Sequence, residues 1–359
     1  MIPVTKPFMP PLSEYNRIIQ EIWNREILTN NGPCVRELEE RLNKILNIQS
    51  LSFVANGTLA IQIAIKALKL SGEVITTPFS YIATTSSLLW EGLQPVFVDI
   101  DPYTLNIDTT KIESHITEKT SAILATHVYG NPCNVDHIKK IAKKYNLKVI
   151  YDAAHCFGTR YEDKSILSYG DVSTISFHAT KLFHTIEGGG IVTNSSDDVS
   201  KIVKLMRNFG HDGPDRFDAI GINGKNSEFH AAMGLVNTRY INDILDSRKR
   251  QYLYYKENLE SLPIRWIRIS KKATFNYAYS PLIFENEKTV QDLQKILELK
   301  GVFTRRYFYP SLSSLEFVSP QITPKSDDIS RRVLCLPLFY SLKEKEQDVI
   351  IGTIKKYFK

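Results

Sequence analysis

Short apolar runs alternate with helix-like patterns between about residues 50 and 195. The runs are continuously hydrophobic, as in strands that are covered on both faces. The segment 135–145 places apolar residues at i, i+3, i+4 and i+7, the spacing of an amphipathic helix, and 57–70 is apolar nearly all round, which predicts a buried helix. Strands that alternate with helices indicate an α/β fold with a mainly parallel sheet. The predicted strands are 51–55, 73–77, 95–100, 122–127, 148–151 and 172–177.

The pattern changes near residue 245. A long polar helix is expected over 247–259, and strand-like and helical segments follow it in mixed order. We therefore predict two domains: an N-terminal arm with a large domain over 1–244, and a smaller α+β domain over 245–359. The segments expected in the smaller domain are strands 264–269, 275–284 and 302–309, a helix 290–299 and a final helix that runs to Tyr357.

Composition narrows the class of protein. With 359 residues, 43% of them hydrophobic and 23% charged, the chain resembles an ordinary globular protein that needs no disulfides. The net charge of +6 is spread along the chain, so we expect no nucleic-acid partner. No apolar run is long enough to span a membrane. The chain contains no CxxC pair, which argues against a zinc site. The four scattered cysteines fit a reducing cytoplasm (Cys34, Cys133, Cys156 and Cys335).

Polar residues follow several of the predicted strands, at the sheet edge where α/β proteins bind ligands. Asn56-Gly57-Thr58 opens a helix and could hold an anion, although Asn56 by itself is more simply an N-cap. Tyr81 follows the next strand, where it could equally be a core residue. Asp152 ends an apolar strand, which is costly for a carboxylate unless it meets a cation or caps a helix.

Ser176 lies at the end of the last of these strands and Lys181 follows it. The glycine run 188–190 predicts a tight turn that comes close to a neighbour. Most lysines are solvated, but a lysine held neutral forms Schiff bases with carbonyls. Together the strand ends offer a phosphate grip, an aromatic ring, a carboxylate and a lysine. These are the parts that a pyridoxal 5'-phosphate site requires.

The run Ser176-Phe177-His178-Ala179-Thr180-Lys181, with its Glu187-Gly188-Gly189 tail, resembles the DegT/DnrJ/StrS family of nucleotide-sugar aminotransferases. The resemblance covers nearly the whole chain. It implies the fold type I architecture of pyridoxal phosphate-dependent transferases. In that fold a mainly parallel seven-stranded sheet is flanked by helices and joined to a smaller α+β domain.

By that resemblance, Lys181 would bind the cofactor as a Schiff base and shuttle a proton, and Asp152 would pair with the ring nitrogen. His155 would lie near the phenolic oxygen, Tyr81 would stack on the ring, and Gly57, Thr58 and Ser176 would hold the phosphate. Asn223 would reach the phosphate from the neighbouring subunit, so the active sites would be shared in a homodimer. Substrate contacts are expected at Gly32, Tyr129, His211, Lys225, Arg305 and Tyr309.

Within the family, the chain most resembles members that form dTDP-4-amino-4,6-dideoxy-D-glucose, on segments such as Gly221-Ile222-Asn223-Gly224-Lys225. The implied reaction transfers an amino group from L-glutamate to the C4 ketone of dTDP-4-keto-6-deoxy-D-glucose, for bacterial O antigen or another surface polysaccharide. Amination at C3, a UDP- or GDP-linked sugar, and a non-catalytic regulator with the same fold remain alternatives. Dehydratases of the family carry histidine at the Schiff-base position. The lysine at position 181 therefore argues against a dehydratase.

Overall fold

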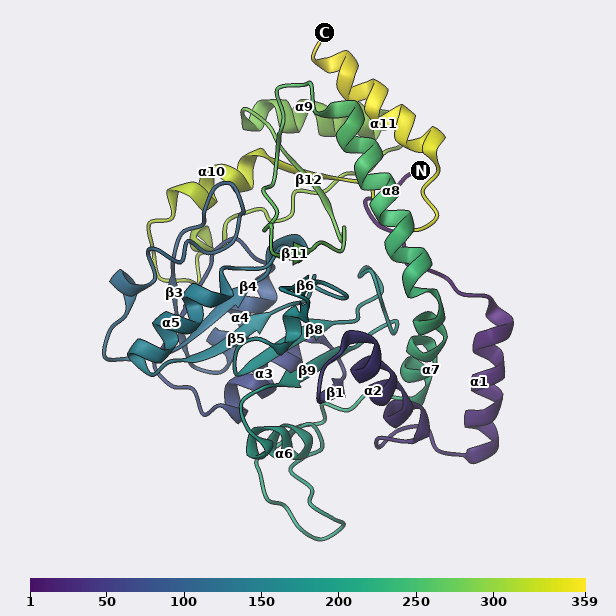
Figure 1. The fold of residues 1–359 in the computed structure, drawn as a ribbon, viewed down its shortest axis with the longest axis vertical. Coiled ribbons are helices and arrows are strands. Elements are labelled where there is room, and N and C mark those ends of the chain that lie inside the picture. Colours follow the sequence, from purple (N-terminus) through teal and green to yellow (C-terminus); the bar gives the residue numbers. More distant parts are fainter.

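The computed structural model describes residues 1–359, and its N-terminal part is built on a seven-stranded sheet (Figure 1). The strand order is β1-β9-β8-β5-β4-β2-β3, and only β9 runs antiparallel to its neighbours. The predicted mainly parallel sheet of seven strands is therefore confirmed. Its strands are β1 (Leu51–Val54), β2 (Glu73–Thr76), β3 (Gln94–Phe97), β4 (Thr120–Thr126), β5 (Lys148–Asp152), β8 (Val172–Ser176) and β9 (Gly189–Thr193).

Strand β9 corrects the interpretation of the glycine run. Gly189 and Gly190 do not form a turn but pair with Val54 and Phe53 of β1. A Cβ atom on Gly189 would lie 2.5 Å from the carbonyl carbon of Asn56. The glycines are needed because β9 passes against the start of the loop that follows β1. The expected close approach is present, and the expected turn is wrong.

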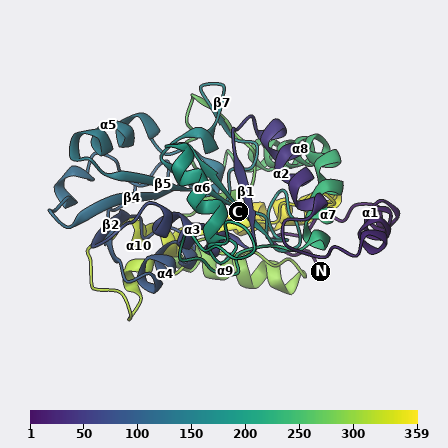
Figure 2. The same cartoon turned by 90° about the horizontal axis from the view of Figure 1, so that it is seen from below.

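Helices cover both faces of the sheet because successive residues of a strand point to opposite sides. In β4, Ala122 and Leu124 belong to a core shared with α3 and α6, whereas Ile123 and Ala125 belong to one shared with α2, α5 and α7. Figure 2 shows α5 and α4 on opposite sides of the sheet. The helices of this part are α1 (Leu12–Arg25), α2 (Pro33–Leu46), α3 (Gly57–Ala67), α4 (Ile82–Trp90), α5 (Val135–Tyr145), α6 (Asp197–Met206) and α7 (Glu228–Asn237).

The C-terminal part has its own apolar core under a three-stranded antiparallel sheet of order β10-β12-β13. The segment 302–309 corrects the prediction of a strand, since it makes only isolated bridges at Val302 and Arg305. Its aromatic residue Phe308 instead packs against Phe79 and Tyr129. The elements are β10 (Arg265–Trp266), β12 (Ser280–Ile283), β13 (Val333–Leu336), α8 (Ile241–Leu259), α9 (Glu287–Leu299), α10 (Pro324–Arg332) and α11 (Glu344–Tyr357).

The two sheets lie on either side of residue 245, in 51–193 and 265–336. Helix α8 begins at Ile241 and runs unbroken through the expected boundary, so the division at 244 stays a prediction. A third small sheet joins β11 (Ala273–Thr274) to β6 (Arg160–Tyr161), which pairs with β7 (Lys164–Ser165). None of the helices combines the length and hydropathy needed to cross a bilayer.

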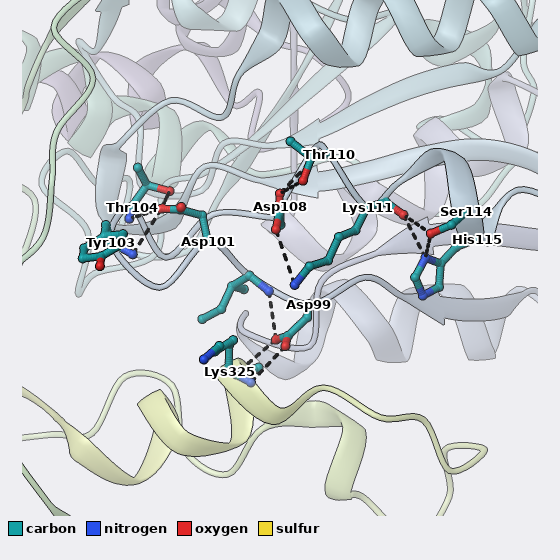
Figure 3. Close-up of polar contacts among 12 residues, drawn as sticks. Asp99, Asp101, Tyr103, Thr104, Asp108, Thr110, Lys111, Ser114, His115 and Lys325 are labelled. Atoms are coloured by element: carbon teal, nitrogen blue, oxygen red, sulfur yellow. Dashed lines mark hydrogen bonds and ion pairs between the residues drawn. The ribbon is translucent and has the colours of Figure 1, made fainter.

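Hydrogen bonds of Asp99 connect the C-terminal part of the chain to the loop after β3. Its carboxylate accepts the Lys325 and Ser326 N–H groups at the start of α10, each at 2.9 Å, and also the N–H of Ile100 at 2.9 Å (Figure 3). The Asp99 side chain is buried. A carboxylate at a helix N-terminus satisfies amides that have no partner within the helix and complements the helix dipole.

Replacing Asp99 by alanine is expected to leave three amides without an acceptor and to lower the free energy of unfolding by about 2–4 kcal/mol. Urea denaturation of the purified variant measures this loss. Asp108→Ala is the matched control, because Asp108 caps an exposed turn at Thr110 and should lose less than about 1 kcal/mol. Equal losses in the two variants would contradict the role given to Asp99.

Candidate active site

One cavity of about 520 Å³ opens at the carboxyl ends of the parallel strands. It is lined from β5 and β8, from the start of α3, and from the C-terminal segment 305–308. The structure thus brings together residues that the sequence places at separate strand ends. The predicted site residues that line the cavity are Gly57, Thr58, Tyr81, Asp152, His155, Ser176, Lys181 and Arg305.

Asp152, the last residue of β5, is a buried carboxylate in the wall of this cavity. Thr84 Oγ1 donates to it at 2.7 Å, and the Ala154 N–H donates at 3.1 Å. Burial raises the pKa of Asp152 despite these two hydrogen bonds and the nearby charge of Lys181. A buried carboxylate without an ion-pair partner in the chain is well suited to meet a cationic ligand group.

A chain of hydroxyl groups supports Asp152. Ser80 Oγ lies 2.7 Å from Thr84 Oγ1 and 2.9 Å from Thr126 Oγ1, and all three side chains are buried. This support was not predicted from the sequence. Its signal is the pair Ser80 and Thr84, which lie four residues apart around the start of α4, a helix rich in hydroxyl side chains.

Lys181 lies just beyond β8, in a turn closed by a hydrogen bond from its N–H to the carbonyl oxygen of His178. Its Nζ donates to the hydroxyl of Tyr279 at 3.4 Å. Burial lowers the pKa of Lys181 to about 8, so a sizeable share of the amine is neutral near physiological pH. Tyr279 comes from the C-terminal part and was not among the predicted site residues.

His155 is held in one protonation state. Its Nδ1 accepts the N–H of Tyr129 at 3.1 Å, which places the ring proton on Nε2. Burial, and after it the charge of Lys181, holds the pKa of His155 well below its usual range. The ring is therefore a neutral donor through Nε2 in the cavity wall.

The start of α3 lines one end of the cavity. Asn56 Oδ1 accepts the N–H of Leu59 at 2.9 Å, which confirms the N-cap interpretation of Asn56. A Cβ atom on Gly57 would lie 3.1 Å from the Cβ of Ser176, so β8 meets the helix start closely. Free amides of a helix N-terminus beside two hydroxyl groups, from Thr58 and Ser176, suit a phosphate.

Tyr81 is the N-cap residue of α4 and lies at the rim of the cavity. Its side chain is 59% exposed, which excludes the core interpretation of this residue. Arg305 lies at the same cavity, is exposed, and forms no ion pair with the chain. Both side chains are free to contact a ligand.

The remaining predicted substrate and cofactor residues do not line the cavity of this chain. Tyr129 is fully buried behind it, where its hydroxyl donates to the carbonyl oxygen of Tyr307. Gly32 packs against Glu228, and the ring of Tyr309 lies 3.6 Å from the guanidinium of Arg306. The other three lie in the loop after α6: His211, Asn223 and Lys225.

The chain is similar to several known proteins over nearly its whole length. The sequence profile of the DegT/DnrJ/EryC1/StrS aminotransferase family matches residues 13–355. The chain is 42% identical over 360 residues to the dTDP-4-amino-4,6-dideoxy-D-glucose transaminase of Shigella dysenteriae, with 98% of both chains covered. It is 39% identical to the protein of the same name from Escherichia coli, over 96% of this chain and 95% of the relative.

A solved structure extends the likeness to three dimensions. The crystal structure of DesI in the presence of its TDP-sugar product matches with a TM-score of 0.93 and 31% sequence identity. The match covers 99% of this chain and 92% of that one.

Proposed function

Because the chain belongs to the DegT/DnrJ/EryC1/StrS aminotransferase family, we propose that it transfers an amino group to the C4 ketone of dTDP-4-keto-6-deoxy-D-glucose. The product would be dTDP-4-amino-4,6-dideoxy-D-glucose. The observation that carries the proposal is the match to two transaminases of that name along nearly the whole chain. We further propose L-glutamate as the donor, a cytoplasmic location, and a product used for O antigen or another surface polysaccharide.

Aminotransferases of this family depend on pyridoxal 5'-phosphate, and the residues of the cavity fit that group. The buried, unpaired carboxylate of Asp152 suits a protonated ring nitrogen, and the start of α3 suits the phosphate. His155 offers a neutral N–H donor, and Tyr81 offers a free aromatic face. When bound, the cofactor supplies an aldehyde and a ring that stabilises negative charge on the donor carbon.

The residues of the chain then have separate tasks. Lys181, whose pKa burial lowers to about 8, takes a proton from the donor carbon at Nζ in its neutral form and later returns it. Asp152 keeps its charge opposite a cation, which offsets the burial that otherwise raises its pKa. Arg305, exposed at the cavity and without an ion pair, is proposed to bind the diphosphate of the sugar nucleotide.

We also propose that two copies complete each site. Large apolar side chains are exposed on α1 and on the loop after α6: Trp23 is 65% exposed, Phe217 64% and Ile220 94%. A second copy that covers them would bury apolar surface. The same loop carries His211, Asn223 and Lys225, which lie away from their own cavity. In the dimer, these three residues would contact the ligand in the partner's site. We propose the same for the expected substrate contacts Gly32 and Tyr309.

Subunit mixing is expected to show the sharing. Lys181→Ala and Asn223→Asp should each be nearly inactive, the second because a carboxylate would repel the cofactor's phosphate. In a mixed dimer one of the two sites is intact, so statistical mixing should restore roughly a quarter of wild-type activity. Activity that stays at the level of the separate variants would contradict a shared site.

The rate at which the cofactor-free protein captures pyridoxal phosphate should rise with pH through about 8, the pKa to which burial lowers Lys181. Only the neutral amine attacks an aldehyde, so the rate follows the deprotonated fraction. The growth of the bound cofactor's absorbance, followed from about pH 6.5 to 9.5, measures it, and free Nα-acetyl-lysine is the control. A protein midpoint as high as that of the free amine would argue against the buried environment.

An absorbance titration tests the proposed function. Glutamate should bleach the lysine-bound cofactor, and dTDP-4-keto-6-deoxy-D-glucose should restore the band after glutamate is removed. NMR of the product then identifies the aminated carbon. Bleaching without recovery would exclude this sugar, and amination at C3 would exclude the C4 assignment.

A further inference from the structure

We propose that Tyr279 is a positioning residue for Lys181, and that its hydroxyl group holds the Nζ atom in the direction needed for reaction. The proposal deepens the proposed function and rests on it. Tyr279 lines the cavity from the C-terminal part of the chain, whereas Lys181 follows β8 of the large sheet. The pair therefore joins two segments that are 98 residues apart in the sequence.

The hydrogen bond to Tyr279 is the one side-chain hydrogen bond of the Lys181 amine, at 3.4 Å. No carboxylate forms an ion pair with Nζ, and Asp152 acts on Lys181 only through its charge at longer range. A lysine side chain has four rotatable bonds, so an amine without a partner would sample several directions. The hydroxyl of Tyr279 restricts that freedom.

Hydrogen bonds of Asn276 fix the backbone just before Tyr279. Asn276 is buried, and its amide donates to the carbonyl oxygens of His155 at 2.8 Å and Phe157 at 2.9 Å. The Asn276 side-chain oxygen accepts the N–H of Ala278 at 3.1 Å. Asn276 thus ties the segment before Tyr279 to the loop that carries His155.

Arg248 of α8 fixes the same segment from the other side. Its guanidinium is buried, has no carboxylate partner, and donates to the carbonyl oxygen of Ala278 at 3.0 Å. The ring of Tyr279 packs against His155 with centroids 4.6 Å apart, and against Tyr307 at 5.5 Å. Backbone and ring are both fixed, so the position of the hydroxyl is set before any ligand binds.

The proposed role of Tyr279 is limited to its hydrogen bond with Lys181 Nζ. Burial raises the pKa of its hydroxyl well above the usual range, so the group stays protonated and is no base at neutral pH. It can accept from the charged amine and donate to the neutral one. The bond therefore persists while Lys181 gives up and regains its proton.

The test compares Tyr279→Phe with Tyr277→Phe. The first variant removes the hydroxyl and keeps the ring. Tyr277 lies in the same segment but packs against Tyr252 and Phe275, away from the cavity, so its variant is the matched control. In Tyr279→Phe, we expect the rate of cofactor bleaching at saturating glutamate to fall about tenfold, with little change in the glutamate KM.

Two readouts do not depend on turnover. The cofactor-free Tyr279→Phe protein should capture pyridoxal phosphate several-fold more slowly, and the circular dichroism of the bound cofactor should change in amplitude. Tyr277→Phe should match the wild type in both, and both variants should keep the wild-type thermal midpoint to within a few degrees.

Wild-type rates and an unchanged cofactor dichroism in Tyr279→Phe would overturn the positioning role while leaving the proposed function intact. A wild-type protein that captures the cofactor but is not bleached by glutamate or another amino acid would overturn the proposed function. In that case the capture rates and dichroism of the two variants still decide the role of Tyr279.

Discussion

Replacing Lys181 by alanine is expected to abolish transamination, with a loss of about 10⁴-fold or more in turnover. The amine has two tasks in the proposed mechanism, covalent capture of the cofactor and transfer of the proton. No other lysine lines the cavity to replace it. The rate of sugar amination, measured with cofactor in excess, checks the loss, and the absorbance of the lysine-bound cofactor should be absent.

The fold of this variant should be intact, because Lys181 forms one side-chain hydrogen bond at the cavity and belongs to none of the apolar cores. Lys140→Ala, on the exposed face of α5, is the matched control and should retain wild-type activity. A Lys181→Ala protein that keeps more than a few per cent of turnover would remove Lys181 from its proposed role.

Asp152→Asn is expected to lower turnover by about 10²- to 10³-fold while the protein stays folded. The amide occupies nearly the same space but has no charge to keep the ring nitrogen protonated. The cofactor would then stabilise negative charge on the donor carbon poorly. Steady-state kinetics measure the loss, and Asp246→Asn, at an exposed position of α8, is the control. Near-normal turnover would refute the pairing.

The same substitution should stabilise the cofactor-free protein at neutral pH. Burial raises the pKa of Asp152 in the folded state above its unfolded value. Between these two pKa values the folded protein retains a proton that the unfolded chain has released. Stability therefore falls as pH rises through this window, and the loss is complete above the folded pKa. The Asp152→Asn variant avoids that loss, because its amide does not titrate.

Thermal unfolding of the two cofactor-free proteins checks this sign. At neutral pH the variant should have the higher midpoint, and the difference should shrink as pH falls below the unfolded pKa of Asp152. Bound cofactor should reverse the order, since the wild-type carboxylate then has a cation beside it. A variant that is less stable at neutral pH without cofactor would show that Asp152 is already compensated within the chain.

Six of the seven strands of the large sheet could be predicted, because a strand covered on both faces forms a continuous apolar run in the sequence. Strand β9 was missed for a local reason. Its first two residues are glycines, which are required by the close approach to β1 and the residues after it. Glycines have no side chain to bury, so they do not form an apolar pattern. The segment 302–309 was mistaken for a strand because its aromatic residues look like a buried run. Only Tyr307 and Phe308 pack around Phe79 and Tyr129, and the other two aromatic side chains are exposed.

The sequence by itself determined the residues whose chemistry is tied to a strand end. Asp152 and Ser176 end strands β5 and β8 of one mainly parallel sheet, and Lys181 follows β8, so the three residues converge at the carboxyl ends of these strands. Only the tertiary structure decided which distant groups complete the site. Tyr279 was not predicted as a site residue, and Arg305 was expected only from the resemblance to the family. The folding of the C-terminal part over the sheet brings both residues to the cavity. The pKa shifts of Lys181 and Asp152 also depend on the tertiary structure. Both shifts arise from burial, and the burial of a side chain is set by all the segments that pack around it.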